Sequence, residues 1–551
     1  MQQDKKTSQD RKRLGELESE SQIWKPHWSE IAEYVNPRKG RFLVGGNSAS
    51  QAGKKKGRKI INSTGTQALR VLAAGLQGGM TPPDSPWLKL GLHDEELEEY
   101  APVRNWLHDV RNIMLDTFQE SNFYSTTHSN YRELGAFGTC SMVMNEDFKT
   151  KIRCRPFTIG EYMFSLDESY RVNGLYRPFD MSVANIVAKF GKENVSSKIK
   201  DEIKRKNFSR MYEVVHVIRE NQERDGNKTS HEGQPWVDKY FEKGNKDHDV
   251  YLSEKSFHSK PFAAARWDVT GIDPYGEGPG MDQLGDIKML QKLEEKKLKA
   301  LDKSIDPSMN GPVGSQANGG TGVSGGINWV EDTRNGFVPT HLVQSSMQDT
   351  AYEIDRVERR IEKGFYNDLF MSIIGTDKKM TAYEVAQRHA EKLVMLGPVI
   401  FRIQSEYHTP AVERSFNIHK DLGAFPPMPE ELQGQNLKIK YISPLAQAQR
   451  MVGIDSIQQT MNFAMSLAEA SPEVLDKIDF DEAVDQFGDM AGTPPKIVKS
   501  DDVVKEVRQL REQKIAAQQQ QEQIAASAQN AKTLSETKVD TNSLLDGLTK
   551  L

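Results

Sequence analysis

The sequence predicts a mainly helical α+β protein, in which long helices surround one region of short strands. Three observations support this fold class. Apolar residues recur at steps of three and four along most of the chain. From Ser141 to Asp268 this pattern gives way to short runs of β-forming residues separated by Gly, Asn and Asp. The chain of 551 residues also exceeds what one hydrophobic core usually serves, so several parts are expected.

Three helices are predicted in the first part of the chain. Residues 14–35 carry apolar side chains at helical spacing, with a kink or a restart expected at Pro26. Residues 62–77 place small and apolar side chains on one face and stop at Gly78-Gly79. A third helix is expected over residues 101–120, beginning beside a proline.

The strand region is predicted to form a small mixed sheet with helices around it. Residues 212–218, 236–241 and 249–252 are its clearest strands, because β-forming residues alternate or cluster there between turn residues.

Two long charged helices are predicted on either side of a glycine-rich insert. They cover residues 281–304 and 347–370, and the insert between them, 306–326, is rich in Gly, Pro, Ser and Asn. Each helix carries a narrow apolar stripe, which is typical of a helix that packs on one neighbour rather than in a broad core. That neighbour is either the other helix or another subunit.

The last third of the chain is again predicted to be helical. Residues 381–421 form a long helix with a kink at Gly397-Pro398, and residues 445–490 are helical after a proline-rich turn. From residue 502 the tail is a helix candidate rich in Gln and Ala.

Charge and hydropathy exclude several classes of protein. The net charge is −5 and the pI near 6.2, so the surface as a whole does not attract nucleic acid, and any DNA contact is local. The longest nearly apolar stretch, 393–403, is about half as long as a membrane span requires. Residues 1–13 lack the apolar core of a signal peptide. A soluble protein made in a cytoplasm is expected, without a membrane partner.

No motif predicts an active site, a cofactor or a metal. The glycines at positions 46 and 53 are too far apart for a phosphate-binding loop, and Lys55 stands where that loop needs Ser or Thr. The GVSGG sequence at 322–326 lies in low-complexity sequence, where a nucleophile is not expected. The histidines and the two cysteines form no ligand cluster. We therefore expect a protein that is not an enzyme and has no cofactor.

Two basic features remain as candidate binding sites. One is a loop that is either simply solvated or a patch that contacts phosphate or protein. Its residues are Lys54, Lys55, Lys56, Arg58 and Lys59. The other is the pair Lys378 and Lys379, in the short connection between two predicted helices.

Several sequence islands together resemble the head-to-tail connector, or portal, family of short-tailed bacteriophages. They are TQALRVLAAGLQGGMTPPDSPW (66–87), RELGAFGT (132–139), ARW (265–267), YGEGPG (275–280), DIK (286–288), MTAYEVAQR (380–388), LGP (396–398) and YISPLA (441–446). Each island alone is weak, but their order and spacing over most of the chain make coincidence improbable.

The resemblance implies the portal fold, with wing, stem, clip and crown or barrel parts assembled as a ring. Transferred to this sequence, the wing covers 1–280 and 381–444, the stem helices 281–304 and 347–373, the clip 305–346, the channel loop 374–380, the crown 445–501 and a barrel-type helix and tail 502–551.

The resemblance also implies contacts for particular residues. Lys378 and Lys379 of the channel loop would face DNA. In the clip, the residues implied to contact the packaging motor and then the tail are Asp306, Pro307, Asn310 and Trp329.

The implied function is that of a portal subunit at one vertex of the virion. Such subunits form a homo-oligomeric ring, twelve-fold in the family, through which double-stranded viral DNA is packaged and ejected. The implied partners are the terminase large subunit, tail adaptor and tail tube proteins, and the major capsid and scaffolding proteins. Assembly would take place in the host cytoplasm. Two alternatives remain, a helical adaptor or scaffold protein without a channel and a DNA-processing enzyme such as the packaging ATPase.

Overall fold

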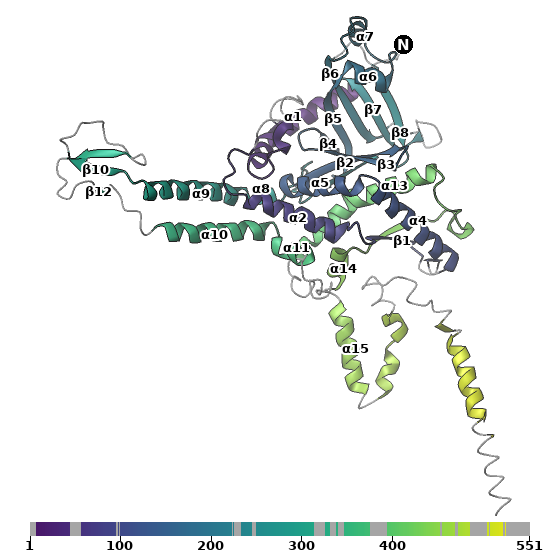
Figure 1. The fold of residues 1–551 in the computed structure, drawn as a ribbon. Helices are drawn as coiled ribbons and strands as arrows, with labels where there is room; N and C mark the ends of the chain where they lie inside the picture. The colour runs from purple at the N-terminus through teal and green to yellow at the C-terminus, as the bar shows by residue number, and fades with distance from the viewer. Residues whose placement is uncertain are drawn as a thin grey trace, which may run out of the picture. The chain divides into compact units, whose positions relative to one another are not determined.

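The computed structural model describes residues 7–43, 57–94, 97–98, 100–222, 224, 233–244, 250–312, 326–330, 338–339, 346–374, 394–451, 454–468, 472–484, 504–505, 507–521 and 524. These residues belong to two compact units, Met1–Gly453 and Ile454–Leu551. The predicted class, mainly helical with a region of strands, is confirmed, and further short strands lie outside that region (Figure 1).

Apart from the short strand β1 (Leu88–Gly91), the elements described up to residue 137 are helical. They are α1 (Ser8–Tyr34), the 3-10 turn η1 (Lys39–Phe42), α2 (Thr64–Met80), α4 (Ala101–Glu120) and α5 (Phe123–Phe137). The bounds of α4 agree with the prediction. The helix α1 is one element across Pro26, so no restart occurs there.

Helix α2 extends past the predicted stop at Gly78-Gly79. Small and apolar residues bury one face of it, as the spacing predicted: Ala68, Leu69, Leu72, Ala73 and Leu76. The last turn remains helical because Gly79 packs closely against Leu445 and the Met80 side chain is buried. Tertiary packing therefore overrides the low helix propensity of the two glycines.

The strands between Thr139 and Arg266 form two antiparallel sheets, and not the single mixed sheet that was predicted. The order β3-β2-β9 joins β2 (Thr139–Asp147), β3 (Lys151–Phe157) and β9 (Phe262–Arg266). The second sheet runs β4 (Met163–Leu166), β5 (Val172–Ser182), β6 (Met211–Glu220), β7 (Trp236–Glu242) and β8 (Ser253–Phe257) in chain order. The predictions for 212–218 and 236–241 are confirmed. Of the strand predicted at 249–252, residue 249 lies outside the described residues and the rest is wrong, since β8 begins at Ser253; the side chains of Tyr251 and Leu252 are buried outside the strand.

Helices cover both faces of the five-stranded sheet. On one face α1 packs Leu14 and Leu17 against Val215 and Val217 of β6. On the other face lie α6 (Val183–Phe190) and α7 (Ser197–Lys204), which share a core cluster with residues of β6 and with Leu252. Because side chains alternate along a strand, β6 contributes to both clusters.

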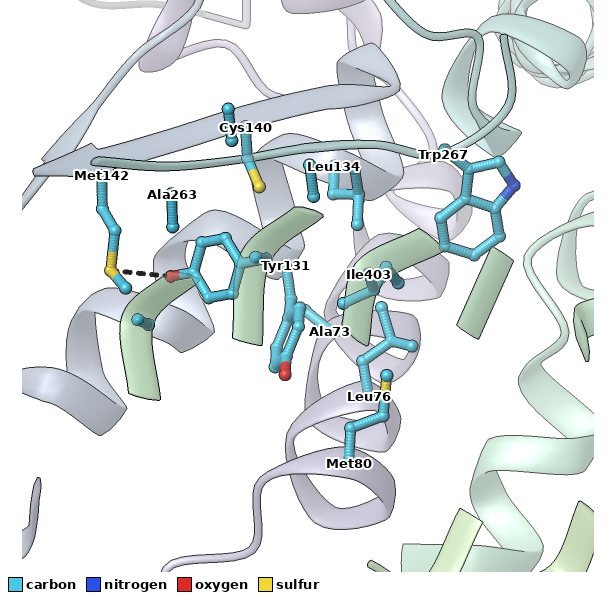
Figure 2. Close-up of a cluster of buried hydrophobic side chains, with 14 of the residues drawn as sticks. Ala73, Leu76, Met80, Tyr131, Leu134, Cys140, Met142, Ala263, Trp267 and Ile403 are labelled. Atoms are coloured by element: carbon cyan, nitrogen blue, oxygen red, sulfur yellow. Dashed lines mark hydrogen bonds between the residues drawn. The ribbon is translucent and has the colours of Figure 1, made fainter. Parts of the chain in front are cut away.

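A larger core joins α2, α5 and the three-stranded sheet. Figure 2 shows Ala73, Leu76 and Met80 of α2 near Tyr131 of α5, and Leu134 of α5 beside Cys140 of β2, with Met142 in the same cluster. Ile403 and Trp267 belong to the same cluster. Both cysteines of the chain are buried as free thiols.

Two neighbouring helices, α9 (Leu284–Ile305) and α10 (Ser346–Gly364), follow the short α8 (Pro279–Asp282) and pack side by side (Figure 1). At their far end are the short strands β10 (Met309–Pro312), β11 (Ile327–Val330) and β12 (Val338–Pro339). The single helix predicted over 347–370 is wrong, because α10 ends at Gly364 and α11 (Asn367–Ile374) is a separate helix. Between them Tyr366 has a left-handed φ of 57°, which ends the helix and redirects the chain.

The rest of the first unit returns across α5 and β9. Residues 394–403 are helical and continue through a π-helical turn, η4 (Gln404–His408), into α13 (Thr409–Asp421). The helix is continuous across Gly397-Pro398, and the irregular turn lies at η4 instead; residues 381–393 are outside the described range. The strand β13 (Lys438–Tyr441) pairs antiparallel with β1 (Leu88–Gly91), and α14 (Pro444–Met451) follows.

The described part of the second unit is helical. It contains α15 (Ile454–Ala468), the 3-10 turn η6 (Pro472–Lys477) and helical residues from 480 to 484 and 507 to 521. Arg508 holds Asp481 through two bonds of 2.7 Å. None of the described helices is both long and apolar enough to cross a membrane.

The buried histidine of the π-helical turn predicts an acid-dependent stability. The Nε2 of His408 lies 2.8 Å from the Tyr131 hydroxyl, which in turn lies 3.1 Å from Thr81 Oγ1. Burial lowers the pKa of His408 to about 3, so the folded state keeps it neutral while the unfolded state binds a proton below about pH 6.5. The stability that depends on neutral His408 is fully present above about pH 6.5 and is lost as the pH falls towards 3.

We therefore expect His408→Gln, which retains polarity without titrating, to flatten the acid limb of the stability curve. At about pH 5 the wild-type chain should lose about 2 kcal/mol that the variant does not lose. Denaturant unfolding of both proteins at a series of pH values measures this difference. Parallel curves would show that His408 does not carry the effect.

Candidate functional site

The candidate site is the junction where α9, α10 and α11 join the body of the first unit, together with the segments that lead from it. A polar cluster at the start of α2 binds the first two helices. The Oε1 of Gln291 accepts from the backbone N–H groups of Ile61 and Asn62, at 2.7 and 2.9 Å, and its Nε2 donates to the Asn62 carbonyl. The Asn62 side chain donates to Glu358 of α10 at 2.7 Å and to Glu294 of α9 at 3.1 Å. One asparagine thus connects both helices to α2.

Ion pairs reinforce the same junction. Arg360 of α10 lies 3.1 Å from Asp286 of α9, and Lys288 of α9 pairs with Glu30 of α1. Because these side chains are about half exposed, each pair contributes at most about 1 kcal/mol and weakens in salt. Their main effect is to fix the direction in which α9 leaves the body.

Helix α11 is seated directly on α2. An added Cβ at Gly75 would lie 2.2 Å from the ring of Phe370, so only glycine allows this approach. Phe370 and Leu369 are fully buried there. The chain leaves this contact at Ile374, where the connection carrying Lys378 and Lys379 begins; both lysines lie outside the described residues.

The four residues predicted to contact partners lie beyond the far end of α9. Asp306 is exposed and follows α9 directly, and Pro307 is half-buried. Asn310 lies in β10 opposite Asn328 of the parallel strand β11. The backbone of Trp329 lies in β11, opposite Gly311. Asn310 and Trp329 thus lie in one small sheet, and Asp306 and Pro307 lie in the segment between α9 and that sheet.

The predicted basic loop is only partly described. Lys54, Lys55 and Lys56 lie outside the described residues, and Arg58 is exposed. Lys59 already has a partner, because its Nζ lies 2.9 Å from Glu33 and above the Tyr34 ring. The hydrogen bond to Glu33 raises the pKa of Lys59 and neutralises its charge locally. Lys59 is therefore a less available phosphate ligand than its sequence position indicated.

Sequence reasoning did not find the closest backbone contact in this region. The segment 276–280, which leads into α8, lies against the end of α5. Trp267 N–H donates to the Gly138 carbonyl, and Gly276 N–H donates to Thr139 Oγ1, both at 2.8 Å. An added Cβ at Gly280 would lie 2.4 Å from the Ala136 carbonyl oxygen. The glycines are needed because two backbones meet here without room for side chains.

A second set of contacts connects the end of α2 to the β1–β13 ladder. Ile442 N–H donates to the Trp87 carbonyl at 2.9 Å, and the Trp87 and Tyr441 rings are nearly parallel at 6.4 Å. Leu445 then packs on Gly79. Segments more than 350 residues apart in the chain are thereby held together at α2.

Comparisons with known proteins identify the family of this chain. Residues 7–498 match the model of the family described as bacteriophage head to tail connecting protein. The chain belongs to this family. The probable portal protein of Bordetella phage BPP-1 is 38% identical over 92% of this chain and 91% of its own length. The portal protein of Salmonella phage epsilon15 is 35% identical over 98% and 97%.

Among solved structures, a chain from the virion of a gene transfer agent particle covers 76% of this chain and 90% of its own length, at 11% identity and a TM-score of 0.35. Because this TM-score is low, the assignment depends on the sequence matches. As a member of the connecting family, the chain is a portal subunit of the junction between phage head and tail.

The family's sequence islands have structural roles in this portal subunit. The island 132–139 contacts the island 275–280 through the α5 backbone, and the islands 66–87 and 441–446 meet around Trp87 and Gly79. The island 380–388 lies outside the described residues. These four islands therefore pack closely around α2 and α5.

Proposed function

We propose that this chain is one subunit of a ring, twelve-fold as in the family, through which double-stranded viral DNA enters and leaves the capsid. The observation that carries the proposal is the match to the connecting family over residues 7–498. In this ring α9 and α10 are the stem, the small sheet β10–β12 belongs to the clip, residues 374–380 are the channel loop, and the five-stranded sheet belongs to the wing. Residues 445–501 supply the crown, and residues 502–551 supply the barrel-type helix and tail.

The surface of α9 supports lateral contact between subunits. Its apolar stripe is completely buried near the junction, at Ile287 and Leu290, but Leu298 is 48% exposed and Ile305 is 74% exposed. Burying such side chains stabilises an interface by about 25 cal/mol for each Å² removed from water. A neighbouring copy of the chain is the partner that a ring supplies.

Transport of DNA by this ring requires weak contacts and no chemistry. Each subunit carries a net charge of −5, so the assembled ring repels phosphates and limits adhesion. Lys378 and Lys379 then supply local, salt-sensitive contacts that position the duplex without reading its sequence. The clip residues Asp306, Pro307, Asn310 and Trp329 serve contacts with the terminase motor and later the tail. Capsid and scaffolding proteins surround the ring at the portal vertex of the virion.

The channel-loop role predicts the effect of replacing both lysines. We expect Lys378→Ala with Lys379→Ala to form rings of normal appearance in negative-stain images but to hold DNA less well. The slope of DNA affinity against salt concentration should fall by about one for each phosphate that the ring no longer binds. The matched control is Lys198→Ala with Lys200→Ala on α7, which removes two exposed lysines elsewhere.

Two results would contradict the proposal at different points. Monomers or filaments of the parent chain, without a central hole, would favour a helical adaptor without a channel. Rings whose double variant packages and retains DNA like the parent would leave the portal role intact but reject the two lysines as DNA contacts.

A further inference from the structure

One face of the five-stranded sheet carries cationic side chains supported by aromatic rings. In the strand register Arg177 of β5 is opposite His216 of β6, which is opposite Tyr240 of β7. The three side chains therefore lie side by side on the same face. Lys189 of α6 lies above this row, with its Nζ 3.7 Å from the centre of the Tyr240 ring.

The row is rigid. The Arg177 guanidinium lies over the rings of both Phe157 and Phe179, at 4.5 and 4.4 Å. The His216 and Tyr240 rings stack at 4.2 Å with an angle of 5° between their planes. Stacking of this kind orients cations before any ligand arrives, so a ligand does not have to order them.

Two further cations border the row. Arg155 is exposed on β3, two residues before Phe157, and so points to the same face of that strand. Lys255 of β8 is also exposed and is opposite Asp238 of β7.

Two carboxylates lie beside these cations. Asp238 lies 2.8 Å from His216 Nε2, and Glu161 lies 3.1 Å from Arg177. Four cations thus face two carboxylates, and the buried Nε of Arg177 lacks an acceptor among the described residues. Burial lowers the pKa of Lys189 to about 8; Asp238 opposes this shift, while the like charges of Arg155, Lys255 and Arg177 add to it. The group therefore has an excess of positive charge that nothing among these side chains balances.

We propose that this cationic face, formed by Arg155, Arg177, Lys189 and Lys255, docks an acidic and extended segment of a partner protein. Carboxylates of that segment would accept from the arginine and lysine donors, which are the strong charge-assisted type of hydrogen bond. The docking is by side chains and not by strand addition at β3, because the Asn122 amide already binds both the N–H and the carbonyl of Cys154 on that edge.

Protein is favoured over nucleic acid by the mixture of charges. Asp238 and Glu161 contact His216 and Arg177 and would repel a continuous phosphate backbone, whereas a peptide can place its carboxylates away from them. Aromatic platforms combined with arginine are also typical of the centres of protein interfaces. This proposal does not depend on the DNA channel and can fail while the portal role stands.

The test uses the full chain and a short fluorescent peptide of alternating glutamate and serine, followed by fluorescence anisotropy. We expect Arg155→Gln with Lys189→Gln to bind the peptide about tenfold more weakly or worse, a loss of about 1.4 kcal/mol. The matched control, Lys198→Gln on α7, removes an exposed lysine outside the face and should bind like the parent. Thermal unfolding of each variant verifies that the fold is retained.

A pH series adds a readout that a structural role would not change. The groups facing Lys189 are Tyr240, Asp238, His216, Arg155, Arg177 and Lys255. Burial raises the pKa of Tyr240 and lowers that of His216, so neither ring titrates near pH 8, whereas burial lowers the pKa of Lys189 to about 8. Affinity should fall as the pH rises through about 8, and Lys189→Arg should remove that fall while retaining binding.

Three outcomes would overturn the proposal. The parent chain could fail to bind the acidic peptide, or the double variant could bind it as tightly as Lys198→Gln does. Tighter binding of a short DNA duplex than of the peptide, lost in the same double variant, would assign the face to nucleic acid instead.

Discussion

Replacing Gly138 with alanine is expected to destabilise the subunit by about 2–5 kcal/mol, since it adds backbone strain to a backbone clash. Gly138 has a φ of +67°, which costs a residue with a Cβ about 1–2 kcal/mol. The new Cβ would also lie 2.3 Å from the Gly276 carbonyl oxygen and 2.6 Å from the Glu277 carbonyl carbon. Backbone atoms cannot rotate out of the way as a side chain does, so the segment 276–280 must move off α5.

Two glycines of the same chain separate the components of this effect. Gly271 has a φ of +58° with nothing near its Cβ position, so Gly271→Ala measures strain without a clash. Gly285, in the first turn of α9, has neither strain nor a close neighbour. Denaturant unfolding of the three variants should give the largest loss for Gly138→Ala, a loss of about 1–2 kcal/mol for Gly271→Ala, and little or none for Gly285→Ala.

The Gly138 contact also bears on assembly, because the displaced segment leads through α8 into α9. A shift of 276–280 changes the direction of both helices that we propose as the stem. Gly138→Ala should therefore reduce the yield of closed rings at temperatures where the isolated subunit is still folded. If Gly138→Ala and Gly271→Ala are equally stable, the close backbone contact between Gly138 and Gly276 adds nothing to the cost of the Gly138 substitution.

The sequence was sufficient for elements whose neighbours are close in the chain. The helix α4 and the apolar face of α2 follow from spacing alone, because a helix places residues three and four apart on one side. The break between α10 and α11 did not follow, because it depends on where Phe370 meets Gly75, nearly 300 residues earlier. The strand predicted at 249–252 failed for a related reason, since Tyr251 and Leu252 are buried by tertiary contacts outside the ladder.

The candidate site, too, could be predicted from the sequence only in part. Lys59 appeared as part of a basic patch until Glu33 and Tyr34 of α1 supplied its partners. Asn62 and Gln291 are single polar residues that belong to no sequence motif, yet they connect three helices. Family islands identified the chain, but the reason for their glycines is a close approach of backbones that no local pattern encodes. The role of Lys378 and Lys379 is still a prediction.

Gly75→Ala is the second change with a large expected effect, and it bears directly on the channel loop. The added Cβ would lie 2.2 Å from Phe370 Cγ and 2.3 Å from Phe370 Cβ, so rotation of the ring cannot relieve the overlap. Helix α11 must move away from α2, at a cost of about 1–3 kcal/mol or more. Since α11 ends where the channel loop begins, we expect rings of this variant to retain less DNA.

Helix α2 supplies the matched control, because an added Cβ at Gly78 meets nothing within 4 Å. Gly78→Ala should be neutral or stabilise the helix by up to about 1 kcal/mol, with DNA retention unchanged. Phe370→Ala alone should cost about 3–5 kcal/mol. Combining it with Gly75→Ala should cost less than the sum of the two, because the ring that opposes the shift of α11 is gone. If the losses of stability are additive, Gly75 is required for something other than its contact with Phe370. A different contact then positions the channel loop.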